Sequence, residues 1–313
     1  MKKTLLSILL ILFLLVFAES YCLVNRVYKY KNDNLGAEIN IRYFIPHSSN
    51  FIKQFWESFD EKYYNKNSSK TIAVLGCSYA EGAGLESNQN LSAQLSDYTN
   101  MSVINMGFGG HGIQSAYKFL SSSDGSFLKR KLPEINYFIY IYLEDHIRRL
   151  YDKNNIFNGE LYPQYKSKNH KLKEINNSIF ALLNMFYFIN TINDYRMYEK
   201  YNKEINDYNL FNDIMLNLNN KTKDLYPNSQ FIILAVPIKH TTKKGKSSMF
   251  PDYELKKLQK MGITVIDAET LTNSDLKDEI YYLEDKNHPN AEYWKLIIPE
   301  LSKRLLLKQA NLT

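Results

Sequence analysis

Residues 71–84, TIAVLGCSYAEGAG, join an apolar run to a glycine-rich turn and decide how this sequence folds. The run from Thr71 to Leu75 is short, apolar and rich in residues that favour strands, which is typical of a strand buried on both faces. Gly76 follows it directly, and Gly82 and Gly84 lie a few residues further on. A buried strand that ends in such a turn before helix-like sequence indicates one unit of a parallel α/β sheet.

The rest of the chain repeats this alternation of strand and helix. The predicted strands are Thr71 to Leu75, Ser102 to Asn105, Tyr137 to Tyr142, Phe231 to Val236 and Thr264 to Asp267. The predicted helices are Leu91 to Tyr98, Ile113 to Leu120, Tyr208 to Leu225, Tyr253 to Met261 and Ala291 to Leu307. This order predicts a doubly wound α/β fold, a flavodoxin-like three-layer sandwich with a five-stranded, mainly parallel sheet.

Composition excludes several classes of protein. The chain has 313 residues, of which 44% are hydrophobic and 23% charged, close to the globular average. The net charge of +6 is spread along the chain without a block of like charges, so nucleic acid is not expected as a partner. The two cysteines, Cys22 and Cys77, do not make a disulfide framework. We expect no cofactor and no metal.

The N-terminus predicts export. Lys2 and Lys3 precede an apolar run of 14 residues, Leu5 to Ala18, which is too short for a comfortable membrane span and typical of a signal peptide. Cleavage after Ala18 fits, but apolar residues resume at 21–24, so an uncleaved anchor stays open. Either outcome predicts a periplasmic, extracellular or outward-facing anchored protein, with membrane contact through its N-terminus.

Three segments follow from these patterns. Residues 1–24 are the signal peptide or anchor, residues 25–70 are a lead-in without a sustained period, and residues 71–313 are the α/β domain. A stretch at about 152–206 breaks the alternation and has an excess of Asn, Lys and Tyr. It is interpreted as an insertion over the top of the sheet, with a helical patch at 179–188, that acts as a substrate lid.

Glycine is concentrated in two loops. Seven of the 12 glycines lie between positions 76 and 112, in turns that follow the first two predicted strands. Doubly wound sheets bind ligands beyond the carboxyl ends of their strands, and glycine lets backbone N–H groups approach a ligand closely. The simpler alternative is that these are only tight strand-to-helix turns.

Three polar residues, one in the first glycine loop and two in a loop before the last predicted helix, suit acyl-transfer chemistry. Ser78 lies on a strand-to-helix turn, where helix N–H groups favour a developing oxyanion, although serine is also a usual helix cap. Its neighbour Cys77 is a weaker candidate nucleophile, because a thiol next to a strand is more often buried and inert. Asp285 precedes His288 by three residues and can hold its ring in the tautomer that accepts a serine proton. The alternative is a histidine in a loop before a helix.

Together these motifs resemble the SGNH, or GDSL-type, hydrolase family. Residues 76–79, GCSY, resemble its first block, with Cys77 where the family has Asp. Residues 105–110, NMGFGG, resemble its second block, Asn-x-Gly-x-x-Gly, and residues 285–288, DKNH, its last. The resemblance covers 71–313 without the insertion.

The resemblance implies a role for each matching residue. Ser78 is implied as nucleophile, His288 as its base and Asp285 as the partner that orients the base. The backbone N–H groups of Ser78 and Gly110 are implied as oxyanion-hole donors.

The third block of the family is not matched. After the strand that ends at Tyr142, where Gly-x-Asn-Asp is expected, the chain has Leu143-Glu144-Asp145-His146. A side-chain amide donor is therefore missing, since an ionised Glu144 only accepts hydrogen bonds. With Arg148 and Arg149, these residues are candidates for binding a polar substrate, or else a charged turn before a helix. A metal site at Asp145, His146 and His111 is not expected, because their spacing is not diagnostic.

These observations predict a serine esterase of SGNH type, exported or anchored, that acts on an acyl ester at the cell envelope, for example an O-acetyl group on a glycan. The partner is then an acylated small molecule or glycan. Two alternatives stay open. An O-acyltransferase would pass the same acyl group to a sugar hydroxyl, and a catalytically weak relative would bind a glycan without turning it over.

Overall fold

The computed structural model describes residues 50–151, 156–157, 160–161, 164–175, 209–237, 257–285 and 287–310. The predicted leader, the helical patch at 179–188 and the first part of the helix predicted from Tyr253 lie outside these residues. The chain divides into two compact units, of which the larger comprises Ser49–Tyr151, Tyr165–Glu174 and Asp207–Thr313. Every candidate site residue belongs to the larger unit. No described helix is long and apolar enough to cross a membrane.

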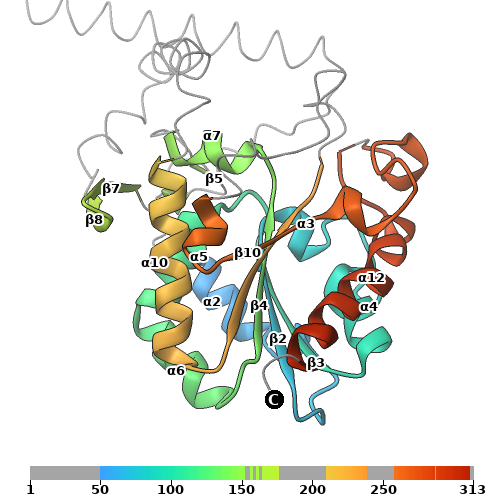
Figure 1. Cartoon of the computed structure of the whole chain (residues 1–313), viewed down its shortest axis with the longest axis horizontal. Coiled ribbons are helices and arrows are strands. Elements are labelled where there is room, and N and C mark those ends of the chain that lie inside the picture. The colour runs from blue at the N-terminus through green and yellow to red at the C-terminus, as the bar shows by residue number, and fades with distance from the viewer. Residues whose placement is uncertain are drawn as a thin grey trace, which may run out of the picture. The chain divides into compact units, whose positions relative to one another are not determined.

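The larger unit is built on a central sheet flanked by helices (Figure 1). Within the described residues the sheet has six strands: β1 (Tyr63–Tyr64), β2 (Thr71–Gly76), β3 (Ser102–Gly107), β4 (Tyr137–Tyr142), β9 (Gln230–Ala235) and β10 (Thr264–Asp267). The strand order is β1-β3-β2-β4-β9-β10, and all pairs are parallel except β1 with β3. The predicted five parallel strands and the α/β class are confirmed, and β1 is an additional edge strand.

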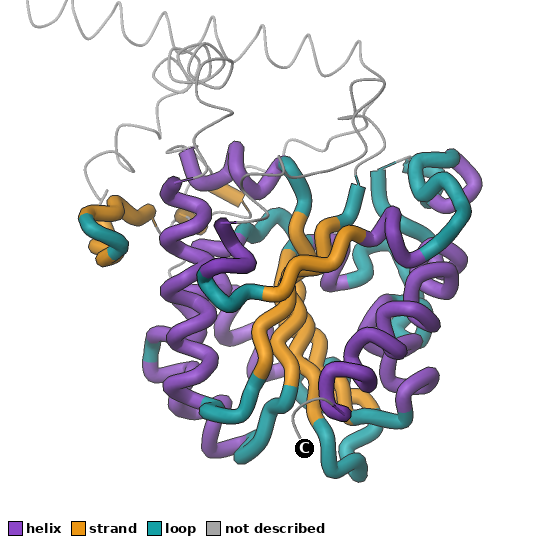
Figure 2. Tube along the Cα trace, viewed as in Figure 1, coloured by secondary structure: helices purple, strands orange, loops and turns teal. Residues whose placement is uncertain are grey.

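Helices cover both faces of the sheet, as Figure 2 shows. One core lies under α2 (Asn50–Glu57), α5 (Ile113–Ser121), α6 (Ser123–Lys131) and α10 (Asn209–Leu225). The other core lies under α3 (Ser78–Glu81), α4 (Leu91–Thr99) and α12 (Ala291–Ala310). Side chains alternate between the two cores along each strand: in β2, Ala73 and Leu75 face the first, and Ile72 and Val74 face the second. The three-layer prediction is thus confirmed.

Shorter elements complete the described chain. They are α7 (Asp145–Tyr151), the antiparallel pair β5 (Ile156–Phe157) and β6 (Glu160–Leu161), the second short sheet of β7 (Gln164–Lys168) and β8 (Lys171–Ile175), and the 3₁₀-helices η2 (Ala268–Leu271) and η3 (Glu279–Tyr281). The pair β5–β6 belongs to the smaller unit.

The lead-in from Asn50 onward is more ordered than its sequence indicates. It forms α2 and β1, and Phe55 is fully buried among aromatic side chains, with its ring centroid 5.1 Å from that of Phe119. Trp56 donates its indole N–H to Asp124 Oδ1 at 3.0 Å. The structure therefore places this part of the predicted lead-in in the same compact unit as the sheet.

Strand order and register bring the two glycine loops together. The parallel strands follow the order second, first, third, fourth, fifth, so the chain reverses direction across the sheet between β2 and β4. Ligands of doubly wound proteins bind beyond the carboxyl ends of strands at such a switch point. Gly76, the last residue of β2, pairs with Gly107, the last residue of β3. Both loops therefore leave the sheet at the same level, next to the end of β4.

We expect Gly107→Ala to destabilise the protein, because the added Cβ would lie 2.2 Å from the Glu81 nitrogen and 2.5 Å from the Ala80 carbonyl carbon. Backbone atoms do not rotate away, so α3 or β3 must shift, at a cost of about 1–3 kcal/mol. Gly112→Ala is the matched comparison, since its nearest contact is a side-chain atom, Oε1 of Gln114 at 2.6 Å, and not backbone. Thermal unfolding should give a lower Tm for Gly107→Ala than for Gly112→Ala. Equal melting temperatures would contradict the close approach of α3 to β3.

Candidate active site

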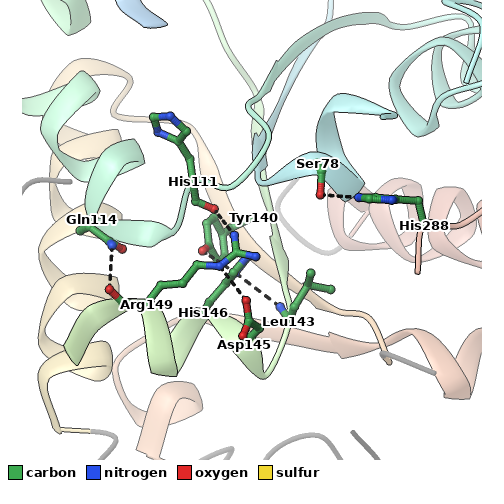
Figure 3. A network of polar contacts seen from close by, with 9 residues as sticks. All are labelled: Ser78, His111, Gln114, Tyr140, Leu143, Asp145, His146, Arg149 and His288. Atoms are coloured by element: carbon green, nitrogen blue, oxygen red, sulfur yellow. Dashed lines mark hydrogen bonds and ion pairs between the residues drawn. The ribbon is translucent and has the colours of Figure 1, made fainter. Parts of the chain in front are cut away.

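Ser78 and His288 meet at the carboxyl end of the sheet, although 210 residues separate them in sequence. Ser78 is the first residue of α3, directly after β2, and is half-buried. Its Oγ lies 3.0 Å from Nε2 of His288 (Figure 3). This distance is a hydrogen bond, so the structure brings together the predicted nucleophile and the predicted base.

Asp285 holds the other side of the same imidazole. Its Oδ2 is hydrogen-bonded to Nδ1 of His288, and its Oδ1 accepts the backbone N–H groups of Asn287 at 2.9 Å and His288 at 3.0 Å. Partial burial raises the pKa of the Asp285 carboxyl, but these hydrogen bonds outweigh burial and hold the pKa below its ordinary value of 3.8. The carboxylate is therefore ionised at neutral pH. An ionised carboxylate at Nδ1 makes that nitrogen the donor and leaves Nε2 to accept a proton from Ser78.

Two hydrogen bonds hold the loop that carries His288 in place. Tyr79, the residue after Ser78, donates its hydroxyl to the Asn287 carbonyl at 2.6 Å and so ties α3 to the loop. The backbone N–H of Leu283 donates to the His288 carbonyl at 2.8 Å. No local sequence pattern indicates this role for Tyr79, because its partner is 208 residues away along the chain.

A second set of contacts fixes α3 against the end of β3. Asn105 donates its Nδ2 to the Glu81 carbonyl at 3.1 Å and accepts the Gly107 N–H on its Oδ1 at 2.9 Å. Gly110 follows in the next loop with a left-handed φ of 76°, a conformation that favours glycine. The structure thus sets the Gly110 loop beside the Ser78 turn, and its role as an oxyanion donor stays a prediction.

The three polar residues after β4 do not form one surface. His146 is fully buried: its Nδ1 lies 2.7 Å from the Tyr140 hydroxyl, and the Leu143 N–H points at the same nitrogen at 3.4 Å. Burial, with a smaller contribution from the nearby Arg149 cation, holds the pKa of His146 well below its ordinary value. A buried neutral ring is not available to a substrate in this structure. Glu144 and Asp145 are half-buried and remain candidates.

Arg149 is a central charged residue beside this site (Figure 3). Its Nε donates to Asp145 Oδ2 at 2.7 Å, and its Nη1 donates to the His111 carbonyl at 2.9 Å. In return, Gln114 donates its Nε2 to the Arg149 carbonyl at 3.3 Å. The sequence pattern grouped Arg149 with the charged turn but did not show that it reaches the second glycine loop.

Cys77 is not placed to act as a nucleophile. Its side chain is fully buried, and burial raises the pKa of the thiol, an effect that the neighbouring Arg149 guanidinium only partly opposes. A thiol rather than a thiolate is therefore present at neutral pH, and the thiol is the weaker nucleophile. Cys77 is the residue at the N-cap of α3, and its side chain makes no capping hydrogen bond to the helix.

A small cavity lies below the second glycine loop. Its volume is about 20 Å³, room for about one water molecule, and its lining is mainly apolar and includes Phe55, Phe108, His111 and Gly112. Burial and the Arg149 charge lower the pKa of His111 to about 4, so its ring is neutral at physiological pH. In the described part of the chain, no three His, Cys, Asp or Glu side chains are grouped as metal ligands.

Comparison with known proteins finds likeness in structure and not in sequence. The chain matches no protein-family model and no curated protein. Among solved structures it is similar to the psychrotrophic esterase EstA from Pseudoalteromonas sp., with 14% identity over 77% of this chain and 98% of that chain and a TM-score of 0.44. It is also similar to Axe2, an acetylxylan esterase from Geobacillus stearothermophilus, with 10% identity over 76% and 94% and a TM-score of 0.42.

A third similar structure is a protein of the G-D-S-L family from Desulfitobacterium hafniense, with 15% identity over 74% of this chain and 98% of that chain and a TM-score of 0.40. G-D-S-L is the family whose motifs this sequence resembles.

Proposed function

We propose that this protein is a serine esterase that hydrolyses an acyl ester, with Ser78 as its nucleophile. One observation carries the proposal: Ser78 Oγ lies 3.0 Å from His288 Nε2, while Asp285 binds Nδ1 on the opposite side of the same ring. A serine hydroxyl is a weak nucleophile until a positioned base takes its proton, and a carboxylate behind the base holds the tautomer that this transfer requires.

The geometry supports the following reaction. Ser78 Oγ bonds to the ester carbonyl carbon, His288 Nε2 takes the hydroxyl proton, and the carbonyl electron pair moves onto its oxygen. Asp285 stabilises the imidazolium that results. When the adduct collapses, His288 returns the proton to the leaving alkoxide and an acyl-Ser78 ester remains. Water then attacks this ester, with His288 again as the base, and releases the acid.

The proposed substrate is an O-acyl group on an envelope glycan or a related acylated small molecule. The half-buried carboxylates of Glu144 and Asp145 follow β4, at the switch point of the sheet. Carboxylates accept hydrogen bonds and so suit the hydroxyl groups of a sugar. The basic and apolar pattern of residues 2–18 supports the envelope as the place of action.

The triad predicts that a fluorophosphonate probe labels Ser78, because only an activated serine reacts with it quickly. Peptide mapping by mass spectrometry should find the label on Ser78 in the parent and none after Ser78→Ala. Cys77→Ala should keep most of the labelling rate, since the buried thiol takes no part. Labelling at a different residue, or its loss in folded Cys77→Ala, would count against the assignment.

We expect Asp285→Asn to lower kcat for a small aryl ester by up to about 10⁴-fold, because the amide no longer holds the tautomer or stabilises the imidazolium. His288→Ala should lower kcat at least as much. Asp275→Asn is the matched control: Asp275 also accepts a backbone N–H two residues on, from Lys277 at 2.9 Å, but is not in the site. If Asp285→Asn retains parental activity while folded, the pair Asp285–His288 is only a loop before a helix.

Export is predicted to depend on the apolar run at 5–18. A fusion of residues 1–30 to a reporter that is active only outside the cytoplasm should give signal. The same fusion with Leu10→Arg and Leu12→Arg should give none, because the two charges interrupt the apolar run. An unmodified fusion without signal would rule out both the signal peptide and the anchor.

A further inference from the structure

The position of Arg149 is unfavourable in free energy unless its charge is compensated. Only 15% of its side chain is exposed, and a buried guanidinium is tolerated when its charge is paired and its donors are bonded. Asp145, one turn earlier on α7, supplies the countercharge at 2.7 Å. The residues that follow β4 thus present a fixed, paired cation at the carboxyl end of the sheet.

This cation is bonded to the second glycine loop. Its Nη1 donates to the His111 carbonyl, the residue that follows Gly110, while Gln114 at the start of α5 donates back to the Arg149 carbonyl. Gly109, Gly110 and Gly112 make this loop conformationally permissive, so its shape depends on contacts from outside. Two hydrogen bonds in opposite directions therefore hold α7 and this loop together.

The charge of Arg149 also reaches the turn that carries Ser78. Its guanidinium lies beside Cys77, the residue before Ser78, and acts to lower the pKa of that thiol. It also lowers the pKa of His111 on the other side. Both effects have the sign of a local positive potential, which favours negative charge and disfavours a second cation. A tetrahedral adduct at Ser78 carries its new negative charge at this same end of the sheet.

We propose that Arg149 is a positioning residue for the reaction at Ser78: through the His111 carbonyl it fixes the loop that presents Gly110, and its charge favours the oxyanion of the tetrahedral adduct. The inference rests on the proposed esterase function. Arg149 exchanges no proton, because a guanidinium stays charged throughout the reaction. It stabilises the transition state through its fixed charge and through the loop that it holds in place. Such a group is needed after β4, because the next residues, Leu143 and Glu144, offer no neutral side-chain hydrogen-bond donor.

The test compares three variants of the full chain on p-nitrophenyl acetate, an uncharged ester that needs no cation for binding. Arg149→Gln should lower kcat by about 10²-fold, the usual effect of losing one oxyanion-stabilising group, and change KM less than about threefold. Arg149→Lys keeps the charge but not the fork that bonds Asp145 and His111 together, so it should recover about tenfold of that loss.

Arg304→Gln is the matched control. Arg304 lies on α12 and makes the same kinds of contact, with a carboxylate one turn earlier (Glu300) and with a backbone carbonyl of another element (Thr270 in η2). Its kcat should stay within about twofold of the parent. Tm values measured in parallel separate a loss of folding from a loss of rate.

Three results would overturn the inference. The first is a folded Arg149→Gln with parental kcat. The second is a rise in KM at constant kcat in Arg149→Gln, which would make Arg149 a substrate-binding residue. The third is Arg149→Lys with full parental kcat. If Arg149→Gln does not fold, the kcat of Arg149→Lys decides alone. A parent that neither turns over ester nor labels at Ser78 overturns the proposed function and this inference with it, whereas an active parent with an equally active Arg149→Gln overturns only the inference.

Discussion

The register that pairs Gly76 with Gly107 is the constraint on which the rest of the site depends. It ends β2 and β3 at one level, so the turn that carries Ser78 and the loop that carries Gly110 leave the sheet side by side. The short helix after β2 then packs so closely on β3 that its backbone occupies the place of a Gly107 side chain. A side chain there would force a shift of β3 or of α3, the helix that begins with Ser78.

Two polar networks meet at this edge of the sheet and differ in burial. The triad is partly open to solvent, and hydrogen bonds hold its carboxylate ionised against the opposing effect of partial burial. The network around Arg149 is less exposed than the triad, and burial keeps the rings of His111 and His146 neutral at physiological pH. Of Arg149, His111 and His146, only Arg149 therefore carries a positive charge. An open triad gives a substrate access, and the covered cation keeps a fixed field beside it.

Elements with a clear local sequence pattern, either an apolar run or a helical period, could be predicted, and elements without such a pattern could not. The strands β2, β3, β4 and β9 are short apolar runs, because both of their faces are buried, whereas in the edge strand β10 only Ile266 is buried. The eight residues of α2 do show a helical period, but it lasts only about two turns and is not sustained in the residues around it, whereas β1, with two residues, is too short to show any period. Trp56 illustrates the difference: its place depends on Asp124 and Phe127, which come from α6.

The sequence by itself determined the α/β class, the two glycine loops and the local pair Asp285–His288, because each depends on residues that are neighbours along the chain. Only the tertiary structure decided that His288 reaches Ser78, that His146 turns into the core, and that Arg149 bonds the His111 carbonyl. These contacts depend on how strands and helices pack across the sheet, and side-chain packing between distant segments leaves no periodic trace in the sequence.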